Sequence, residues 1–447
     1  MASPFPAHSL VCKSVHRLSR RISFAAAIGM VALSANVYSA EPPLTLAAAQ
    51  RLAVSRSRQL PANDYAVTAA REMAVAAGQL PDPVLKAGVD NLPVNGPDRF
   101  SLTNDFMTMR RVGIMQEITR SDKRQWRAAR FEREADKSGA EKNEALAAIQ
   151  RDSALAWLDR YYAEAMVTVI AEQATQAKFE IQAAEGAYRA GRGNRADIFS
   201  ARSAYATFQD RASEAERRVR NARTMLARWV GNDGNLPLAG KPAIDVIRLD
   251  RADLETQLAH HPRIAVLTKQ EEIAVVDVKL AEANRKADWS VEVAYQQRGP
   301  AYSNMVSAGV SIPLQWDRKN RQDREISSKL ALVEQAKAER DEMLRSHVAE
   351  TLVMMNEWEN GRERSARFEQ ELIPLANSRT LAAIAAYRGG KTTLADVLLA
   401  RRNEIDVRIQ ALQLQTEVAR LWAQLNFLFP DDSVIASSAA AIHRDVK

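Results

Sequence analysis

The sequence predicts a mainly helical protein with very long helices and four short β-strands. Three observations lead to this fold class. No proline interrupts the chain between Pro97 and Pro237, two separate regions alternate between apolar and polar residues, and one turn motif occurs twice. Long helices need stretches without proline, whereas half-buried strands alternate with a period of two residues.

The composition is that of a folded, helix-rich chain. Of its 447 residues, 46% are hydrophobic, which is enough for a large core. The formal net charge is +7, but Lys13, Arg17, Arg20 and Arg21 supply four of these charges in a segment without acidic residues. Because the rest of the chain is close to neutral, we expect no nucleic-acid partner.

Residues 1–40 have the pattern of an export signal, with an uncleaved signal anchor as the alternative. Arginines precede an apolar stretch at 22–35, and the small residues Ser39 and Ala40 follow it. The single cysteine, Cys12, lies before the apolar stretch, so the processed chain would contain neither a disulfide nor a thiolate metal site. No later apolar run reaches the roughly 18 residues that a membrane-spanning helix needs.

Long helices account for most of the remaining chain. The segment from Ser121 to Tyr188 is predicted to be one nearly unbroken helix, which would be roughly 100 Å long. Its counterpart in the second half contains Pro374, where the helix should kink or break. The predicted helices cover residues 45–80, 121–188, 195–230, 251–286, 317–387 and 394–429.

Two regions between these helices predict β-hairpins with one apolar and one polar face. In the first, apolar residues alternate with polar or small ones over 85–89 and 112–118. The apolar positions of the second hairpin include Val291, Val293, Val306, Val310 and Ile312.

A small half-buried sheet on a helical protein is one interpretation of these hairpins. A membrane β-barrel is the other, and Trp289 and Trp316 lie at the strand ends, where barrels place interfacial aromatic residues. Because a barrel needs about eight or more strands, four strands could close one only by oligomerisation.

The repeated motif predicts two turns, each joining a pair of long helices. In each copy a glycine suits the left-handed conformation that ends a helix. A polar residue followed three positions later by aspartate is then typical of an N-terminal capping box. The residues are Gly191, Asn194 and Asp197 in the first copy, and Gly390, Thr393 and Asp396 in the second. A duplicated helical hairpin implies an internal twofold repeat within one subunit.

No pattern in the sequence indicates catalysis. The chain has no nucleophile elbow, no phosphate-binding glycine loop and no paired Cys or His spacing. The adjacent His260 and His261 cannot face one ion from the same helix. Met107, Met109 and Met115 could offer thioethers to Cu(I) or Ag(I), but packing is the commoner use of methionine. We therefore expect no enzyme, no cofactor and no metal site.

The turn pattern Tyr-x-x-Gly-x-x-x-x-x-Asp, which starts at Tyr188 and again at Tyr387, resembles that of the TolC-like outer-membrane factors. This resemblance covers about residues 44–429. The heavy-metal branch, which serves cobalt-zinc-cadmium and copper-silver efflux, is resembled in particular by the segments Asn91-Leu92-Pro93, Met107-Thr108-Met109-Arg110-Arg111 and Gln116-Glu117.

The resemblance implies a homotrimer whose strands jointly form one twelve-stranded barrel in outer-membrane lipid. The helices would continue this barrel as an α-barrel of coiled-coil hairpins across the periplasm. Expected partners are a periplasmic adaptor and an inner-membrane pump of the RND type. The expected function is passive conduction of heavy-metal cations. A drug-efflux or type I secretion duct of the same fold is the first alternative, and a periplasmic coiled-coil adaptor or scaffold is the second.

The resemblance also assigns the two turns to the periplasmic tip. It implies that three copies of Asp396 form an acidic ring around the pore, where they would attract cations and raise one another's pKa. Asp197 would lie off the axis and face the neighbouring hairpin and Tyr387. The alternative is that both aspartates serve only as helix caps.

The predicted organisation divides the chain into five parts. A signal peptide at 1–40 precedes a first structural repeat at 41–230. A connecting equatorial segment at 231–249 leads to a second repeat at 250–430, and a C-terminal tail occupies 431–447.

Overall fold

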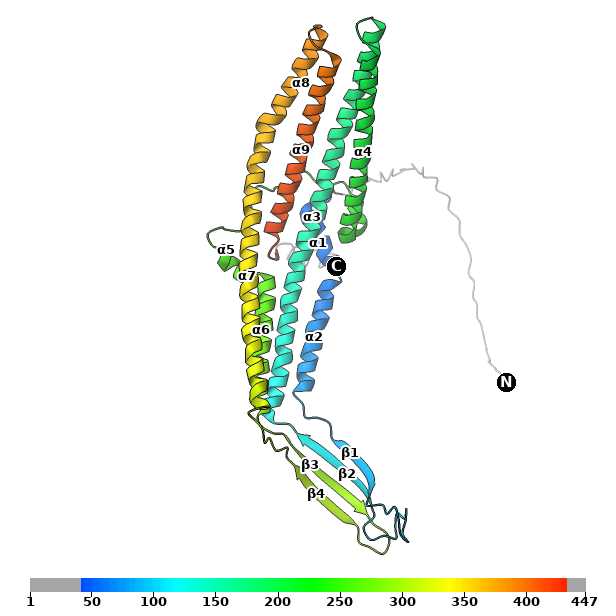
Figure 1. Cartoon of the computed structure of the whole chain (residues 1–447), viewed down its shortest axis with the longest axis vertical. Helices are drawn as coiled ribbons and strands as arrows, with labels where there is room; N and C mark the ends of the chain where they lie inside the picture. The colour runs from blue at the N-terminus through cyan, green and yellow to red at the C-terminus, as the bar shows by residue number, and fades with distance from the viewer. Residues whose placement is uncertain (1–41, 432–447) are drawn as a thin grey trace, which may run out of the picture. The chain divides into compact units, whose positions relative to one another are not determined.

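The computed structural model describes residues 42–431 of the chain (Figure 1). The predicted signal peptide, together with Cys12, lies outside the described residues, as does the predicted tail beyond position 431.

In the first half, two short helices and a pair of strands precede two long helices. The helices are α1 (Leu46–Arg56), α2 (Gln59–Ala77), α3 (Ser121–Arg189) and α4 (Arg195–Val230), and a short 3-10 helix covers Gly231–Asn235. The 69 residues of α3 confirm the predicted unbroken helix.

In the second half, two short helices and a second pair of strands precede an interrupted long helix and its return helix. The helices are α5 (Leu254–Ala259), α6 (Pro262–Asn284), α7 (Gln322–Arg367), α8 (Ile373–Arg388) and α9 (Leu394–Asn426). A π-helical turn, η2 (Phe368–Leu372), joins α7 to α8 directly before Pro374, where the sequence predicts an interruption.

Two predicted helices are each divided into two, and both breaks have local causes. At Ser57 the backbone becomes extended, and the hydroxyl accepts a hydrogen bond from the amide of Gln59 at 3.2 Å. A serine hydroxyl that bonds to nearby backbone amides in this way offers the chain an alternative to continuing the helix. The second break lies at His261, directly before Pro262, and a residue before proline is disfavoured in helical conformation.

All four strands form one antiparallel sheet in the order β1-β2-β3-β4. The strands are β1 (Val84–Asp90), β2 (Met109–Ile118), β3 (Trp289–Gln297) and β4 (Met305–Ser311). The two predicted hairpins are present, and the pairing of β2 with β3 joins them. A Cβ atom on Gly113 would lie 2.7 Å from that of Ala294, so only glycine fits at this crossing of β2 and β3.

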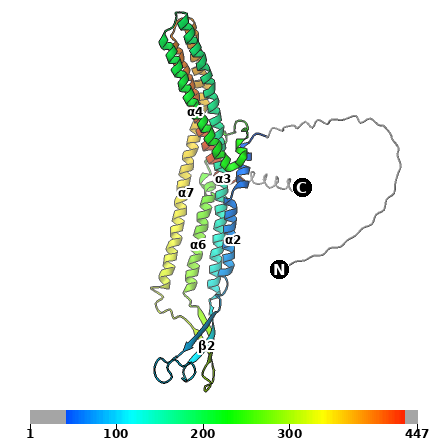
Figure 2. The same ribbon diagram turned by 90° about the vertical axis from the view of Figure 1, so that its right-hand side faces the viewer.

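The helix α3 is the central element of the packing. It contacts α2 and α6 along its first part and α4 and α9 along its second, and both views show α2, α3, α6 and α7 side by side (Figure 2). The main core lies midway, around Trp157 and Leu226. The indole of Trp157 donates to the carbonyl of Leu44 at 2.9 Å, which ties the start of the chain to α3.

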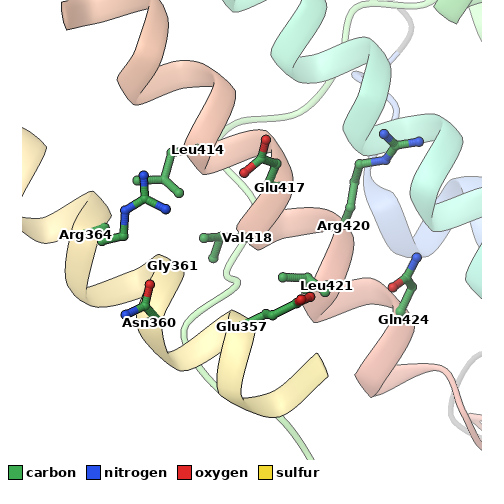
Figure 3. A pocket seen from close by; sticks show the side chains of 10 residues that line it. All are labelled: Glu357, Asn360, Gly361, Arg364, Leu414, Glu417, Val418, Arg420, Leu421 and Gln424. Carbon is green, nitrogen blue, oxygen red and sulfur yellow. The ribbon is translucent and has the colours of Figure 1, made fainter. Parts of the chain in front are cut away.

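The helices α7 and α9 pack closely at Gly361 and Val418 (Figure 3). A Cβ atom on Gly361 would lie 2.6 Å from a methyl group of Val418, so glycine permits this approach. Beside the contact lies a groove of about 610 Å³, and Figure 3 shows charged side chains from both helices around it, among them Arg364 and Glu417.

Candidate functional site

The predicted turn residues lie at the end of α3 that is farthest from the sheet. In the first turn, Ala190 is the C-cap of α3. Gly191 follows it with a φ of +71°, which is the left-handed conformation that the sequence predicts. The amide of Arg192 donates to the carbonyl of Ala187 at 2.9 Å, which closes the helix end. The second turn repeats this geometry, with Gly390 at +68°.

Both predicted capping boxes are present, but their aspartates are not equivalent. The Asp197 carboxylate accepts one hydrogen bond, from the amide of Asn194 at 3.1 Å. The Asp396 carboxylate accepts three: from the amide and hydroxyl of Thr393 at 3.1 and 2.7 Å and from the hydroxyl of Thr392 at 2.6 Å. The second turn has two more donors than the first because the hydroxyls of Thr392 and Thr393 both donate to its aspartate. The sequence did not indicate the role of Thr392.

The hydrogen bonds to Asp396 stabilise its charged form. The Thr392 hydroxyl, then the Thr393 hydroxyl and the Thr393 amide, lower the pKa of Asp396 to about 2. Within one chain this shift is opposite in sign to the rise expected for three converging carboxylates. The side chain is exposed and anionic at neutral pH, so it can act on ions as well as cap α9.

The two turns pack against each other through a small apolar cluster. Ala184 and Ala201 of the first hairpin and Leu394 and Val397 of the second are buried there, and Tyr387 packs against them. By contrast, Tyr188 is 48% exposed. Among the described residues, the hydrogen bonds of Asp197 are those of its capping box with Asn194.

Below the turns, a ladder of alternating charges joins α3 to α9. Arg408 lies 3.0 Å from Glu404 and 3.9 Å from Glu172, while Arg401 lies 3.6 Å from Glu404 and 3.4 Å from Glu180. Glu404 is only 2% exposed. Burial raises the pKa of Glu180, and the charge of Arg401 opposes that rise. We name these five residues the charge ladder, and they hold the two hairpins together.

A groove of about 630 Å³ runs between α4 and α9 beside this ladder. Its rim includes Phe199 and Leu399, which are 60% and 54% exposed. Arg211 and Arg402 contribute positive charge to the lining. Such large exposed apolar side chains next to basic ones are typical of surfaces that bind another protein.

At the other end of α3, the sheet has the two faces that the sequence predicts. Val291 pairs with Val310, and Val293 lies between Ile114 and Ala308, so these side chains share one face. Val306 follows on the same face as the partner of Tyr295. Ile312 lies one residue beyond the end of β4, where it is exposed. Most of these side chains are open to solvent in the single chain.

The opposite face of the sheet carries an ion-pair network that spans three strands. Lys86 of β1 lies 2.7 Å from Glu292 of β3, reaching it across Gly113 of β2. Arg111 pairs with the same carboxylate and lies 3.7 Å from Asp90. The polar face is therefore charged, whereas no part of residues 42–431 covers the apolar face.

Over residues 42–431, no helix is long and apolar enough to cross a membrane. In the same range, no three histidine, cysteine or acidic side chains are arranged to hold a metal ion. The rings of His261 and His347 pack at an angle of 57° with centroids 4.3 Å apart, and burial lowers the pKa of His261 to about 4. Its ring nitrogen accepts a hydrogen bond from the amide of Arg263, so this imidazole caps α6.

The arrangement of helices and sheet matches several solved structures over most of their length. CusC, solved in a study of folding and transmembrane channel formation, has a TM-score of 0.73 and 14% identity over 86% of this chain and 92% of its own. The outer-membrane channel OprN has a TM-score of 0.70 and 16% identity over 86% and 90%. The outer membrane protein VceC from Vibrio cholerae has a TM-score of 0.68 and 18% identity over 86% and 95%.

This chain has the TolC-like outer-membrane channel fold. No family model matches the sequence. No curated protein matches it either. In this channel fold, the sheet and the two turns form opposite ends of the long helices.

Proposed function

We propose that the protein is the outer-membrane channel of a tripartite efflux system. The observation that carries this proposal is the four-stranded sheet, which has one exposed apolar face and unpaired edges on β1 and β4. In lipid, unpaired backbone groups at a sheet edge cost several kcal/mol each, so the edges must meet those of other copies. Three copies would supply twelve strands, and Val291, Val293, Val306, Val310 and Ile312 would face lipid.

The long helices would then continue the barrel across the periplasm as an α-barrel. Their internal twofold repeat would place six hairpins around the axis of a trimer. Residues 1–40 would act as the export signal, followed by the repeats at 41–230 and 250–430 joined through 231–249. Conduction along such a tunnel needs no catalysis, so the protein would be a passive duct and no enzyme.

The hairpin turns would form the periplasmic entrance. A periplasmic adaptor, itself bound to an inner-membrane RND pump, would contact this end. The groove between α4 and α9 supports such a contact, because its lining includes the exposed side chains of Phe199 and Leu399 in the first two turns of the two helices. At the turn itself, Asp396 would line the pore and favour cations.

The proposed cargo is heavy-metal cations. This part rests on the sequence segments 91–93 and 107–111, which resemble the metal-efflux branch. A drug-efflux or type I secretion duct has the same fold and is the second candidate. The apolar exposed sheet face argues against a periplasmic adaptor or scaffold, since nothing in the periplasm would cover it. Deletion of the gene in a host exposed to Cu(I), Ag(I), Zn²⁺ or Cd²⁺, with organic antibiotics in parallel, distinguishes the cargoes.

Assembly can be tested directly. The processed protein is expected to fractionate with outer membranes and to migrate as a trimer after mild detergent extraction, because its sheet edges need partners. Membrane fractionation combined with native mass spectrometry measures both. A monomer recovered from the soluble periplasmic fraction would overturn the proposal.

Replacing Asp396 by asparagine tests the entrance. The change keeps an acceptor for the Thr393 amide but removes three negative charges per trimer from a narrow constriction. We expect lower cation preference and weaker block by multivalent cations. Single-channel recordings in planar bilayers measure both quantities.

Asp197→Asn is the matched control for this variant, because it has the same capping geometry in the first turn. It is expected to leave ion selectivity unchanged. If both variants behave as the unmodified channel does, the two aspartates are helix caps only.

A further inference from the structure

Another pocket, of about 440 Å³, lies midway along the helices, far from both the turns and the sheet. It forms where the segment around residues 241–245 lies against α3, α7, η2 and α9. Volumes of 300–1,000 Å³ are typical of sites for small organic ligands. The charged and polar lining residues are Tyr162, Lys241, Asp245, Glu359, Arg362, Glu363, Ser365, Glu369 and Gln415.

The lining is acidic, with four carboxylates against one lysine and one arginine. Two of the carboxylates have partners: Glu359 lies 3.0 Å from Arg251, and Glu369 lies 3.9 Å from Lys241. Within residues 42–431, Asp245 and Glu363 form no ion pair. The negative charge of these two groups is therefore available to a ligand.

The positive charge of Arg362 is directed elsewhere. Its guanidinium lies over the Trp358 ring, 4.7 Å from the centroid. Stacking of this kind holds the cation against the aromatic face. The arginine therefore shapes one wall of the pocket without neutralising Asp245.

Within the described part of the chain, two buried hydroxyl groups at the pocket have no hydrogen-bond partner. Tyr162 is only 3% exposed, and its hydroxyl has neither a donor nor an acceptor within reach. The oxygen of the Ser365 hydroxyl is also buried and also has no hydrogen-bond partner among the described residues. An unpaired buried polar group destabilises the folded protein, so a ligand that pairs with these hydroxyls gains affinity.

The Tyr162 hydroxyl lies near the acidic side of the pocket. Burial raises its pKa to about 12, and the neighbouring Tyr161 and the negative charges of Asp245 and Glu369 add to the rise. At neutral pH the hydroxyl is protonated and can still accept a hydrogen bond from a cationic donor.

The spacing of the carboxylates distinguishes a metal ion from an organic cation. Among the described residues, no three acidic or histidine side chains are close enough to share one ion. Calcium requires six to eight oxygen ligands around one point, and magnesium requires an octahedron. Separate carboxylates around 440 Å³ instead match a ligand with separate positive groups.

We propose that this pocket binds a small linear amine with two or more ammonium groups. One ammonium would lie between Asp245, Glu369 and the Tyr162 hydroxyl, and another would pair with Glu363. The inference does not depend on the channel function, since the site lies within one chain.

Calorimetric titration of the purified full-length protein in detergent, at low salt, tests the site. The probes are 1,4-diaminobutane, spermidine and magnesium chloride. We expect one amine site per chain, tighter for spermidine than for diaminobutane, and no comparable magnesium binding. The double variant Asp245→Asn, Glu363→Gln keeps side-chain volume and should weaken amine binding about tenfold or more. Tyr162→Phe should weaken it about threefold or more, since one hydrogen bond is lost.

Glu334→Gln is the control, because this glutamate lies on α7 outside the pocket, is exposed and already pairs with Lys337. Amine affinity should not change in this variant. Three outcomes would each overturn the proposal. These are unchanged amine affinity in the double variant, tighter binding of magnesium than of either amine, and no measurable heat on titration with the amines. Circular dichroism melting of every variant separates lost binding from lost folding, and outer-membrane fractionation of the same variants reports on the channel proposal independently.

Discussion

Arginine at Val293 is expected to prevent assembly of the trimer in the outer membrane. Val293 lies in the middle of β3 between Ile114 and Ala308, is 51% exposed, and belongs to the apolar face. In a barrel it would contact lipid, where arginine near the midplane costs roughly 2–4 kcal/mol. Because each trimer contains three copies, we expect almost no trimer in outer-membrane fractions, measured by cross-linking and immunoblotting.

Ser307→Arg provides the matched control. Ser307 is adjacent to Ala308 in β4 and pairs with Ala294, so it lies at the same height on the opposite face. An arginine there would enter the polar interior near Gln296, and trimer yield should stay within about twofold of the unmodified protein. Equal tolerance of both arginines would show that the apolar face is not the lipid face.

The replacement Arg408→Met is expected to loosen the two hairpins from each other. It would remove the 3.9 Å contact to Glu172 of α3 and leave the Glu404 carboxylate of α9 buried with Arg401 at 3.6 Å as its remaining cation. Breaking a buried ion pair by removing one partner costs about 3–5 kcal/mol, and the remaining arginine places this case at the lower end. Hydrogen exchange of the amides around residues 394–410 should become faster, with a lower melting temperature.

Arg211→Met tests whether burial of the charge ladder explains this effect. Arg211 pairs with Asp406 at 3.0 Å on the same pair of hairpins, but about a third of each side chain is exposed. A pair of this kind contributes about 1 kcal/mol or less. Adding Glu404→Gln to Arg408→Met should restore part of the lost stability, because it removes the buried charge. Equal effects of Arg408→Met and Arg211→Met would contradict this explanation.

Much of the fold follows from local sequence signals. The first turn begins α4 at Arg195 because Asn194 and Asp197 complete a capping box, and proline-free sequence lets α3 run for 69 residues. Strand faces were predictable because alternation fixes which side chains share a face. These signals act over a few residues, so a single sequence is enough to read them.

The parts that the sequence did not predict depend on contacts between distant segments. Pairing of β2 with β3 brings Gly113 against Ala294 across a long separation, and nothing local to either residue indicates it. The charge ladder likewise joins Glu180 to Arg401, and the amine pocket joins Tyr162 to Asp245. Arginines and glutamates are so frequent in long exposed helices that their spacing alone does not identify the buried ones.

The two long arms between sheet and turns have nearly the same length, although they are built differently. The first is the uninterrupted α3 of 69 residues, and the second consists of 46 residues in α7, 5 in η2 and 16 in α8. At about 1.5 Å per residue, the difference amounts to only about 3 Å. The two arms therefore hold the two hairpin turns at nearly the same distance from the sheet. Deleting the residues of one helical turn from a single arm would shift the hairpin turn at its end by about 5 Å relative to the other hairpin turn. Matched deletions in both arms would shorten the distance from the sheet to the hairpin turns and keep the two turns aligned.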